Sequence, residues 1–212
     1  MKTFPDFIEN LSDRLTGPLP GLASQLKMAG TRRILHEGRP VIPADAKHAG
    51  VLILFYPVNS AMNIVFMKRT EYPGVHSGQI SFPGGGREPH DTDIVETALR
   101  ETEEEIGINR EDIILIGKLT ELFIPPSNFL VTPIVGYTAM RPEFKPDSGE
   151  VDRIIEIPVD LLLKENTKQT REITVFPDMK LKVPCFYIDG DVIWGATAMI
   201  LNELLEVISQ GS

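Results

Sequence analysis

Three glutamates crowd the end of one predicted helix in this chain of 212 residues. Glu101, Glu104 and Glu105 are spaced i, i+3 and i+4, which places their carboxylates on one helical face. The C-terminal end of a helix carries partial negative charge, so acids there repel the helix and one another. A hard cation such as Mg²⁺ would compensate them, with water and substrate phosphates as its remaining ligands. The spacing therefore predicts a metal site, and the alternative is a solvated acidic face.

The helix that carries these glutamates has clear boundaries in the sequence. Asp93 is a typical N-cap with Glu96 three residues later, and Gly107 is a typical C-terminal stop. Arg100 lies four residues from both Glu96 and Glu104, so it can pair with either. It would then hold Glu104 for a metal, or form only a surface salt bridge. Apolar and small residues at helical spacing predict the core-facing stripe: Val95, Leu99, Thr102 and Ile106.

A glycine-rich turn precedes this helix. Pro83 follows a short apolar segment, which indicates the end of a strand. Gly84, Gly85 and Gly86 come next, and three glycines allow the backbone to turn sharply and to approach a ligand closely. An ordinary turn is the alternative interpretation of such a run. Its position directly before the glutamate helix favours a role in substrate binding.

Taken together, these residues resemble the Nudix box, G-x5-E-x7-R-E-U-x-E-E-x-G-U with U apolar. The match is specific over Arg100-Glu101-x-x-Glu104-Glu105-x-Gly107, with Ile108 in the last apolar position. At the position of the first acid, counting back from Arg100 gives Thr92, and Asp91 lies next to it. The resemblance leaves open which of these two residues takes that role.

A second motif resembles the coenzyme A pyrophosphatase branch of the Nudix hydrolases, in which L-L-T-x-R-S-x3-R-x3-G-x3-F-P-G-G precedes the box. Residues 65–70 (Val-Phe-Met-Lys-Arg-Thr) lead in matching register to Gly78 and to Phe82-Pro83-Gly84-Gly85. Two positions depart, because Met67 replaces the threonine and Gly74 replaces the second arginine. The two motifs together cover residues 65–108.

The resemblance implies roles for further residues. Arg69, at the end of the upstream motif, would bind phosphate with its fixed fork of donors, and a surface salt bridge is its alternative. His76, between Arg69 and Gly78, would contact a phosphate or remain a solvated loop histidine. Glu150 follows the loop 141–149, where Nudix relatives often supply one more carboxylate. The resemblance thus implies three sets of residues: catalytic Glu101, Glu104, Glu105 and Arg100; substrate-binding Arg69, Gly84, Gly85, Gly86 and His76; and metal-binding Glu101, Glu104, Glu105 and Glu150.

The implied function is Mg²⁺- or Mn²⁺-dependent cleavage of the diphosphate of coenzyme A or acyl-coenzyme A. The products would be 3′,5′-ADP and 4′-phosphopantetheine or its acyl form. Two alternatives stay open. In the first, the substrate would be ADP-ribose or another nucleoside diphosphate derivative. In the second, the domain would sense a ligand without turnover. The general base is a helix glutamate or a loop glutamate, and the sequence does not distinguish them.

The amino-acid composition argues against several other classes of protein. A net charge of −9 argues against nucleic-acid binding, which requires basic surface. No apolar stretch reaches the roughly 18 residues needed to span a membrane, and a single cysteine fits a reducing compartment. We therefore expect a cytoplasmic enzyme with a small nucleotide diphosphate substrate and no nucleic acid or membrane partner. A homodimer is one oligomeric state that the sequence allows.

The pattern of elements predicts an α/β fold. Residues 1–30 read as an N-terminal helical segment, interrupted at Gly17-Pro18-Leu19-Pro20-Gly21, and residues 31–212 as the Nudix hydrolase domain. The resemblance implies an α/β/α sandwich with a mixed β-sheet between helices. A long helix closes the chain from Trp194 to Ile208. Strands are expected at residues 49–55, 64–69, 114–120, 131–139, 151–157, 172–176 and 181–188, with a short helix at 159–163.

Overall fold

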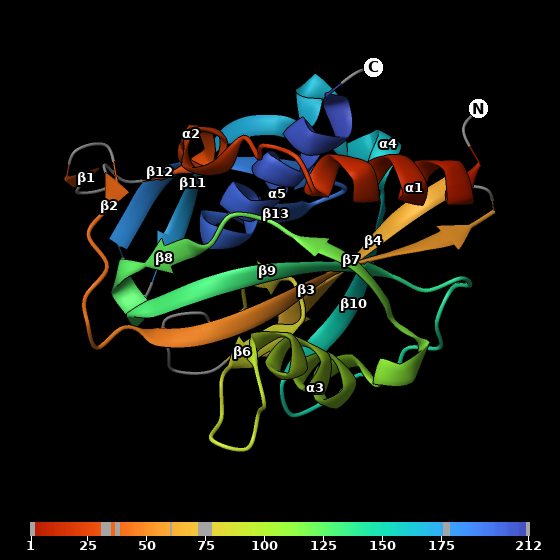
Figure 1. The fold of residues 1–212 in the computed structure, drawn as a ribbon. Coiled ribbons are helices and arrows are strands. Elements are labelled where there is room, and N and C mark those ends of the chain that lie inside the picture. Colours follow the sequence, from red (N-terminus) through yellow and green to blue (C-terminus); the bar gives the residue numbers. More distant parts are fainter. Residues whose placement is uncertain are drawn as a thin grey trace.

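A mixed β-sheet forms the centre of the molecule, with helices on both faces (Figure 1). The computed structural model describes residues 3–30, 35–36, 39–59, 61–71, 78–175 and 179–210. Five strands are hydrogen-bonded in the order β10-β4-β3-β9-β7, and three short strands extend β4, β3 and β9. The strands of this sheet are β3 (Lys47–Val58), β4 (Ala61–Arg69), β5 (Ile80–Ser81), β6 (Gly84–Gly86), β7 (Ile114–Lys118), β8 (Leu122–Ile124), β9 (Phe129–Tyr137) and β10 (Val151–Pro158).

The sheet is mixed because β3 and β9 run parallel while the other neighbours run antiparallel. A second, antiparallel sheet has the order β11-β12-β13, and β1 pairs with β2. These strands are β1 (Leu35–His36), β2 (Arg39–Pro40), β11 (Lys168–Val175), β12 (Met179–Ile188) and β13 (Asp191–Trp194). The predicted mixed sheet between helices is thus confirmed.

Helices cover the two faces unequally. In Figure 1, α3 lies on one side of the main sheet, and α1, α2 and α5 lie on the other. No helix among the described residues is long and apolar enough to cross a membrane. The α-helices are α1 (Phe4–Leu15), α2 (Gly21–Gln25), α3 (Ile94–Ile106), α4 (Val159–Leu162) and α5 (Gly195–Ser209), and the 3-10 turns are η1 (Leu26–Met28), η2 (Arg110–Asp112), η3 (Pro125–Ser127) and η4 (Glu165–Thr167).

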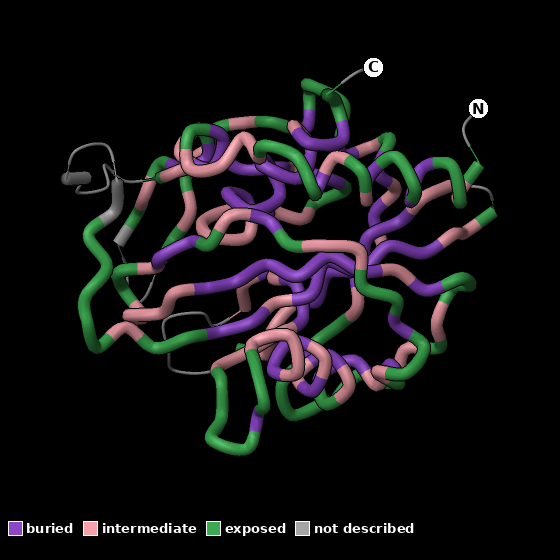
Figure 2. Tube along the Cα trace, viewed as in Figure 1, coloured by how far each residue is buried: buried purple, intermediate pink, exposed green. Residues whose placement is uncertain are grey.

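Two apolar cores follow from alternation along the central strands. Successive side chains of a strand point to opposite faces. On β3, Ile53 and Phe55 join the larger core under α1 and α5, whereas Leu52 and Leu54 join the smaller core under α3. Figure 2 shows the resulting line of buried residues through the middle of the sheet. The strands read as nearly continuous apolar runs because both of their faces are covered.

The first helices and the last helix are joined by polar contacts within the larger core. Arg14 of α1 donates to the carbonyls of Val207 and Ile208 at the end of α5, at 3.2 Å for Val207. Glu203 of α5 is fully buried and accepts hydrogen bonds from Gln25 Nε2 at 2.8 Å and from Thr120 Oγ1 at 2.6 Å. These bonds satisfy a carboxylate that burial would otherwise penalise. They fix α1 and α2 against α5.

Candidate active site

Helix α3 is held very close to the sheet. Asp93 caps its first turn by accepting two backbone N–H groups at 2.8 and 2.9 Å, and Gly107 ends it with a φ of 72°. Both predicted boundaries are therefore confirmed. A Cβ atom at Gly50 of β3 would lie only 2.5 Å from the carbonyl oxygen of Ile94. The glycine on the strand thus allows the helix backbone to pack directly on the sheet.

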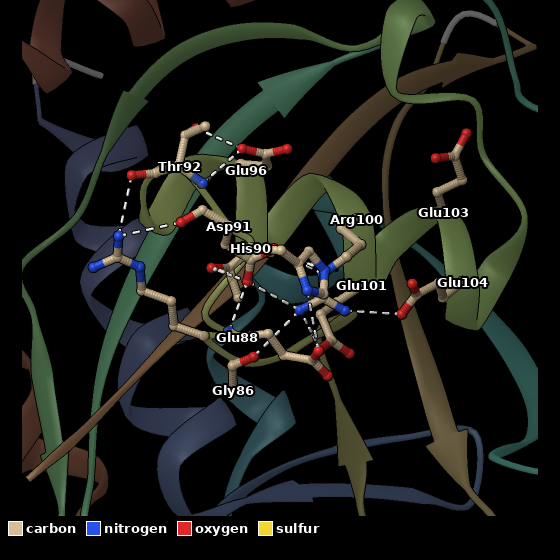
Figure 3. Close-up of polar contacts among 12 residues, drawn as sticks. Gly86, Glu88, His90, Asp91, Thr92, Glu96, Arg100, Glu101, Glu103 and Glu104 are labelled. Carbon is tan, nitrogen blue, oxygen red and sulfur yellow. Dashed lines mark hydrogen bonds and ion pairs between the residues drawn. The ribbon is translucent and has the colours of Figure 1, made fainter.

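Arg100 is the centre of a charged network between α3 and the glycine strand β6 (Figure 3). Arg100 is only 7% exposed. Its Nε and Nη2 atoms donate to the two carboxylate oxygens of Asp91 at 2.9 and 3.1 Å. Its Nη1 atom binds Glu104 at 2.9 Å, and Nη2 lies 2.9 Å from Glu101. Nη2 also donates to the carbonyl of Gly86 at 3.3 Å. One guanidinium therefore contacts three carboxylates and the glycine strand.

Asp91 is the acid that neutralises this arginine. It is buried and also accepts hydrogen bonds from Thr97 Oγ1 at 2.9 Å and from the N–H of Glu88 at 2.8 Å. The hydrogen bonds from Arg100 hold the pKa of the Asp91 carboxyl well below its ordinary value. Asp91 is therefore ionised and saturated with donors, and this geometry fits a positioning residue better than a metal ligand.

Thr92, the other residue left open by the sequence, has a different role. Its backbone N–H donates to Glu96 at 2.8 Å, and its hydroxyl donates to the same carboxylate. These hydrogen bonds lower the pKa of Glu96. Of the two pairings considered for Arg100, the structure contains the one with Glu104; Glu96 is instead occupied by Thr92.

Glu105 does not lie on a solvated acidic face, which was the alternative interpretation of the three glutamates. It is only 2% exposed, because the glycine strand β6 covers it. Its two oxygens accept the N–H of Gly84 at 2.8 Å and Arg69 Nη1 at 3.1 Å. Burial raises the pKa of Glu105 to about 7, against an ordinary value of 4.5. The single neighbouring arginine thus does not fully compensate the cost of burying the charged carboxylate.

Glu101 lies against the same glycine strand. A Cβ atom at Gly85 would stand 2.4 Å from the Glu101 carboxyl carbon, and one at Gly84 would stand 2.3 Å from the carbonyl oxygen of Gly50. A side chain at Gly84 would collide with the backbone of β3, and one at Gly85 would displace the Glu101 carboxylate. Burial raises the pKa of Glu101, and the neighbouring Glu104 charge raises it further, while Arg100 opposes both effects. The glycine run therefore lets β6 lie between β3 and the carboxylates of α3.

Arg69 connects the helix to the loop that carries Glu150. It is the last residue of β4, and its second nitrogen, Nη2, lies 3.6 Å from Glu150 Oε2. Glu150 is exposed, with its backbone carbonyl bound by the N–H of Thr70 at 2.9 Å. Of the site residues expected from sequence, the structure brings together the four glutamates, both arginines and the three glycines. His76 lies outside the described residues.

The protein's own cations hold these carboxylates in the structure. Among the described residues, no group of three His, Cys, Asp or Glu side chains lies close enough to hold a metal ion as they stand. Arg100 draws Glu101 and Glu104 toward itself, and Arg69 draws Glu105 and Glu150. The carboxylates still affect one another, because the charge of Glu150 raises the pKa of both Glu101 and Glu105.

The donor set suits a hard divalent cation. Among the described residues, four glutamates and Asp91 pair with two guanidinium groups, which leaves an excess of negative charge in this part of the site. All of the available donors are carboxylate oxygens, which Mg²⁺ and Mn²⁺ prefer. A bound cation would compensate this excess negative charge and would lower the pKa values of Glu101 and Glu105 toward their ordinary range.

Comparison with known proteins identifies the family. The NUDIX domain family model matches residues 46–177. Nudix hydrolase 22 of Arabidopsis thaliana, described as chloroplastic, is 35% identical over 77% of this chain and 56% of its own length, so this chain spans little more than half of it. The mitochondrial coenzyme A diphosphatase NUDT8 of Homo sapiens is 28% identical over 85% of this chain and 78% of its own.

A solved structure shares the fold. The Nudix hydrolase RenU of M. smegmatis superposes with a TM-score of 0.53 at 16% identity, covering 79% of this chain and 88% of that one. At this identity the likeness concerns the fold alone. The family model covers more than half of the chain, and it includes β6, α3 and the loop that ends at Glu150. The chain therefore belongs to the Nudix hydrolase family.

Proposed function

We propose that this protein is a divalent-metal-dependent pyrophosphohydrolase that cleaves the diphosphate of coenzyme A or acyl-coenzyme A. The products would be 3′,5′-ADP and 4′-phosphopantetheine or its acyl form. The observation that carries the hydrolytic part is Glu105, a carboxylate beside Arg69 and Gly84 whose burial raises its pKa to about 7. Carboxylates with strongly shifted pKa values cluster at functional sites.

Glu101, Glu104, Glu105 and Glu150 would hold Mg²⁺ or Mn²⁺. A bound ion would neutralise the diphosphate and lower the pKa of a water molecule for attack on phosphorus. Because Arg100 is matched by Asp91, it can retain Glu101 and Glu104 in defined orientations without adding a free charge. The remaining chemistry belongs to residues that contact substrate or transfer a proton.

Arg69 is the residue placed to contact the diphosphate. Its guanidinium lies between Glu105 and Glu150 and can exchange a carboxylate partner for a phosphate, which its fork of donors also fits. Where Glu150 does not hold the ion, its exposed carboxylate, 3.6 Å from Arg69 Nη2, would accept a proton from water. A helix glutamate remains the alternative base.

The choice of coenzyme A rests on the upstream motif and on the human relative named a coenzyme A diphosphatase. Met67 departs from that motif, but it is fully buried in the core under α3 and presents nothing to a substrate. The departure at Met67 is therefore a change of packing. Gly74, the second departure, lies outside the described residues, and ADP-ribose stays in the test as the competing substrate.

Metal binding predicts a thermal shift. At ten times its Kd, a ligand that binds only the folded state stabilises it by about 1.4 kcal/mol. For a chain of this size that corresponds to a rise in Tm of roughly 3–6 °C. We expect Mg²⁺ or Mn²⁺ to raise the Tm of the wild type relative to EDTA. A variant with Glu101, Glu104 and Glu105 all changed to Gln should show no shift, and an equal shift in both proteins would place the metal elsewhere.

Substrate choice is tested with coenzyme A, dephospho-coenzyme A and ADP-ribose under the same conditions. A charge-assisted contact to the 3′-phosphate should favour coenzyme A over the dephospho form by about 10–100-fold in kcat/KM. Arg69→Ala should slow both forms alike, because Arg69 lies at the carboxylates that face the diphosphate. Faster turnover of ADP-ribose would reject the coenzyme A assignment. Turnover of none of these diphosphates would favour a ligand-sensing domain.

A further inference from the structure

The chain between β9 and β10, residues 138–150, is a long connection without a helix or strand that touches the active-site helix. The N–H of Lys145 donates to the carbonyl of Ile106 at 2.9 Å, and the N–H of Asp147 donates to the carbonyl of Glu105 at 2.9 Å. These are carbonyls of the last turn of α3, which have no partner inside the helix. A Cβ atom at Gly107 would stand 2.6 Å from Lys145 Cβ, so the packing is close. Loop 138–150 therefore closes the C-terminal end of α3.

The far end of loop 138–150 places Glu150. Asp147 accepts the N–H groups of Glu150 at 3.1 Å and Val151 at 2.8 Å, which forms a turn. Thr70 then binds the carbonyls of Glu150 and Gly149, at 2.9 and 3.1 Å. The same loop thus fixes the backbone of Glu105 and brings Glu150 beside Arg69.

Four side chains hold the near end of the loop. Arg141 donates two parallel hydrogen bonds to Glu156 of β10, at 2.8 and 2.7 Å. The hydroxyl of Tyr56, a fully buried residue of β3, donates to the same carboxylate at 3.1 Å. Phe144 completes the group: its ring lies 5.4 Å from the Arg141 guanidinium carbon and 5.7 Å, edge to face, from the Tyr56 ring. Tyr56, Arg141, Phe144 and Glu156 are called the loop clamp below.

The loop clamp contributes more to position than to overall stability. Arg141 and Glu156 are partly exposed, and ion pairs of this kind add little to the free energy of unfolding. The bidentate geometry nevertheless restricts the loop strongly, because two parallel bonds fix the guanidinium plane. The hydrogen bonds from Arg141 lower the pKa of Glu156, so this carboxylate stays ionised and keeps its partner.

We propose that the loop clamp positions loop 138–150 and, through its bonds to α3 and Arg69, sets the placement of the Glu105 and Glu150 carboxylates. Tyr56, Arg141, Phe144 and Glu156 act as positioning residues. The inference rests on the proposed hydrolytic function. Small misplacement of reacting groups lowers rates steeply, about 100-fold for 1 Å, so even a partial release of the loop should be measurable.

The test compares Arg141→Met with Arg110→Met. Methionine keeps the apolar stem and removes both hydrogen bonds. Arg110 is a matched control outside the loop clamp, because it is similarly exposed and also pairs with a glutamate: its Nε and Nη2 atoms lie 2.9 and 2.8 Å from a single oxygen of Glu103. Each variant is examined by amide hydrogen exchange of Lys145 and Asp147, without substrate, and by the kcat and KM of coenzyme A hydrolysis.

We expect Arg141→Met to speed exchange of both amides and to lower kcat by about 10-fold or more, with a much smaller change in KM. Arg141→Lys should recover part of kcat, and Arg110→Met should change neither measurement. Unchanged exchange, or faster exchange with wild-type kcat, would overturn the proposed role of the clamp. A wild type that hydrolyses no diphosphate would contradict the proposed function, and the exchange comparison would then decide whether the clamp holds the loop.

Discussion

Glu105→Gln is expected to lower diphosphate hydrolysis by about 100-fold or more at saturating metal and substrate. The substitution keeps the size of the side chain and removes the charge of the most buried glutamate in the site. The amide can still accept one hydrogen bond from Gly84 or Arg69, so the fold should persist. Steady-state kinetics with Mg²⁺ would measure the loss.

A control on the same helix separates this effect from a general loss of charge. Glu103 points away from the glycine strand and pairs with Arg110, so Glu103→Gln should retain nearly wild-type kcat. If Glu105→Gln kept a rate close to that of Glu103→Gln, the buried carboxylate would have no part in hydrolysis.

The same variant should remove the pH dependence that Glu105 gives to the stability of the metal-free protein. Folding raises the pKa of Glu105 from 4.5 to about 7, so the folded state binds the proton more tightly. The contribution of Glu105 to the free energy of unfolding is therefore fully present below pH 4.5 and is lost as the pH rises toward 7 and above. At about 1.4 kcal/mol per pH unit the loss reaches roughly 3 kcal/mol.

Urea unfolding in EDTA at pH 5 and pH 8 would show this dependence. Glu105→Gln should be more stable than the wild type at pH 8, whereas the two should be nearly equal at pH 5. Equal slopes of unfolding free energy with pH in both proteins would contradict the burial of an ionisable Glu105.

Asp91→Ala is expected to destabilise the protein by about 3–5 kcal/mol, the usual effect of removing one partner of a buried ion pair. Arg100 would lose both bonds to Asp91 and would keep only Glu101, Glu104 and the Gly86 carbonyl. A drop in Tm of roughly 6–20 °C would follow for a chain of this size.

Asp93→Ala provides the matched comparison for this prediction. Asp93 is an exposed acid two residues away that caps the same helix, and loss of such a cap costs only about 0.5–2 kcal/mol. Chemical unfolding of both variants would measure the difference. Similar losses would mean that Asp91 acts as a local turn residue and that Arg100 does not depend on it.

The sequence predicted local features of the site well. The N-cap at Asp93 and the stop at Gly107 depend on neighbouring residues, and both were correct. Side-chain periodicity could place Glu101, Glu104 and Glu105 on one face, but it could not rank their burial. That ranking depends on β6, which covers Glu105 and leaves Glu104 exposed.

Strand β6 itself was not predicted as a strand. Glycine has a poor propensity for strands, and a run of three is typical of a turn. In the structure, Gly84, Gly85 and Gly86 pair with Val51, Gly50 and Ala49 of β3. The absence of Cβ atoms leaves room for β6 between β3 and the Glu101 carboxylate, and this is a tertiary constraint. The only sign of β6 in the sequence is that three consecutive residues lack side chains.

The loop clamp could not be found from sequence because its members are far apart in the chain. Tyr56 and Glu156 are 100 residues apart and meet only through the order of strands β3, β4 and β10. No local pattern marks Arg141 as a partner of Glu156. Contacts of this kind follow from sheet order and register, which periodicity alone does not determine.

The packing of α1 against α5 has a consequence for synthesis of the protein. Arg14 and its partner Val207 are separated by 193 residues, so a ribosome adding about 5–20 residues per second makes them roughly 10–40 s apart. During that interval the apolar face of α1, with Phe7, Ile8 and Leu11, has no α5 to cover it. The larger core therefore closes only after translation has passed α5, and a nascent chain stalled before that point would expose α1 to chaperones and to aggregation.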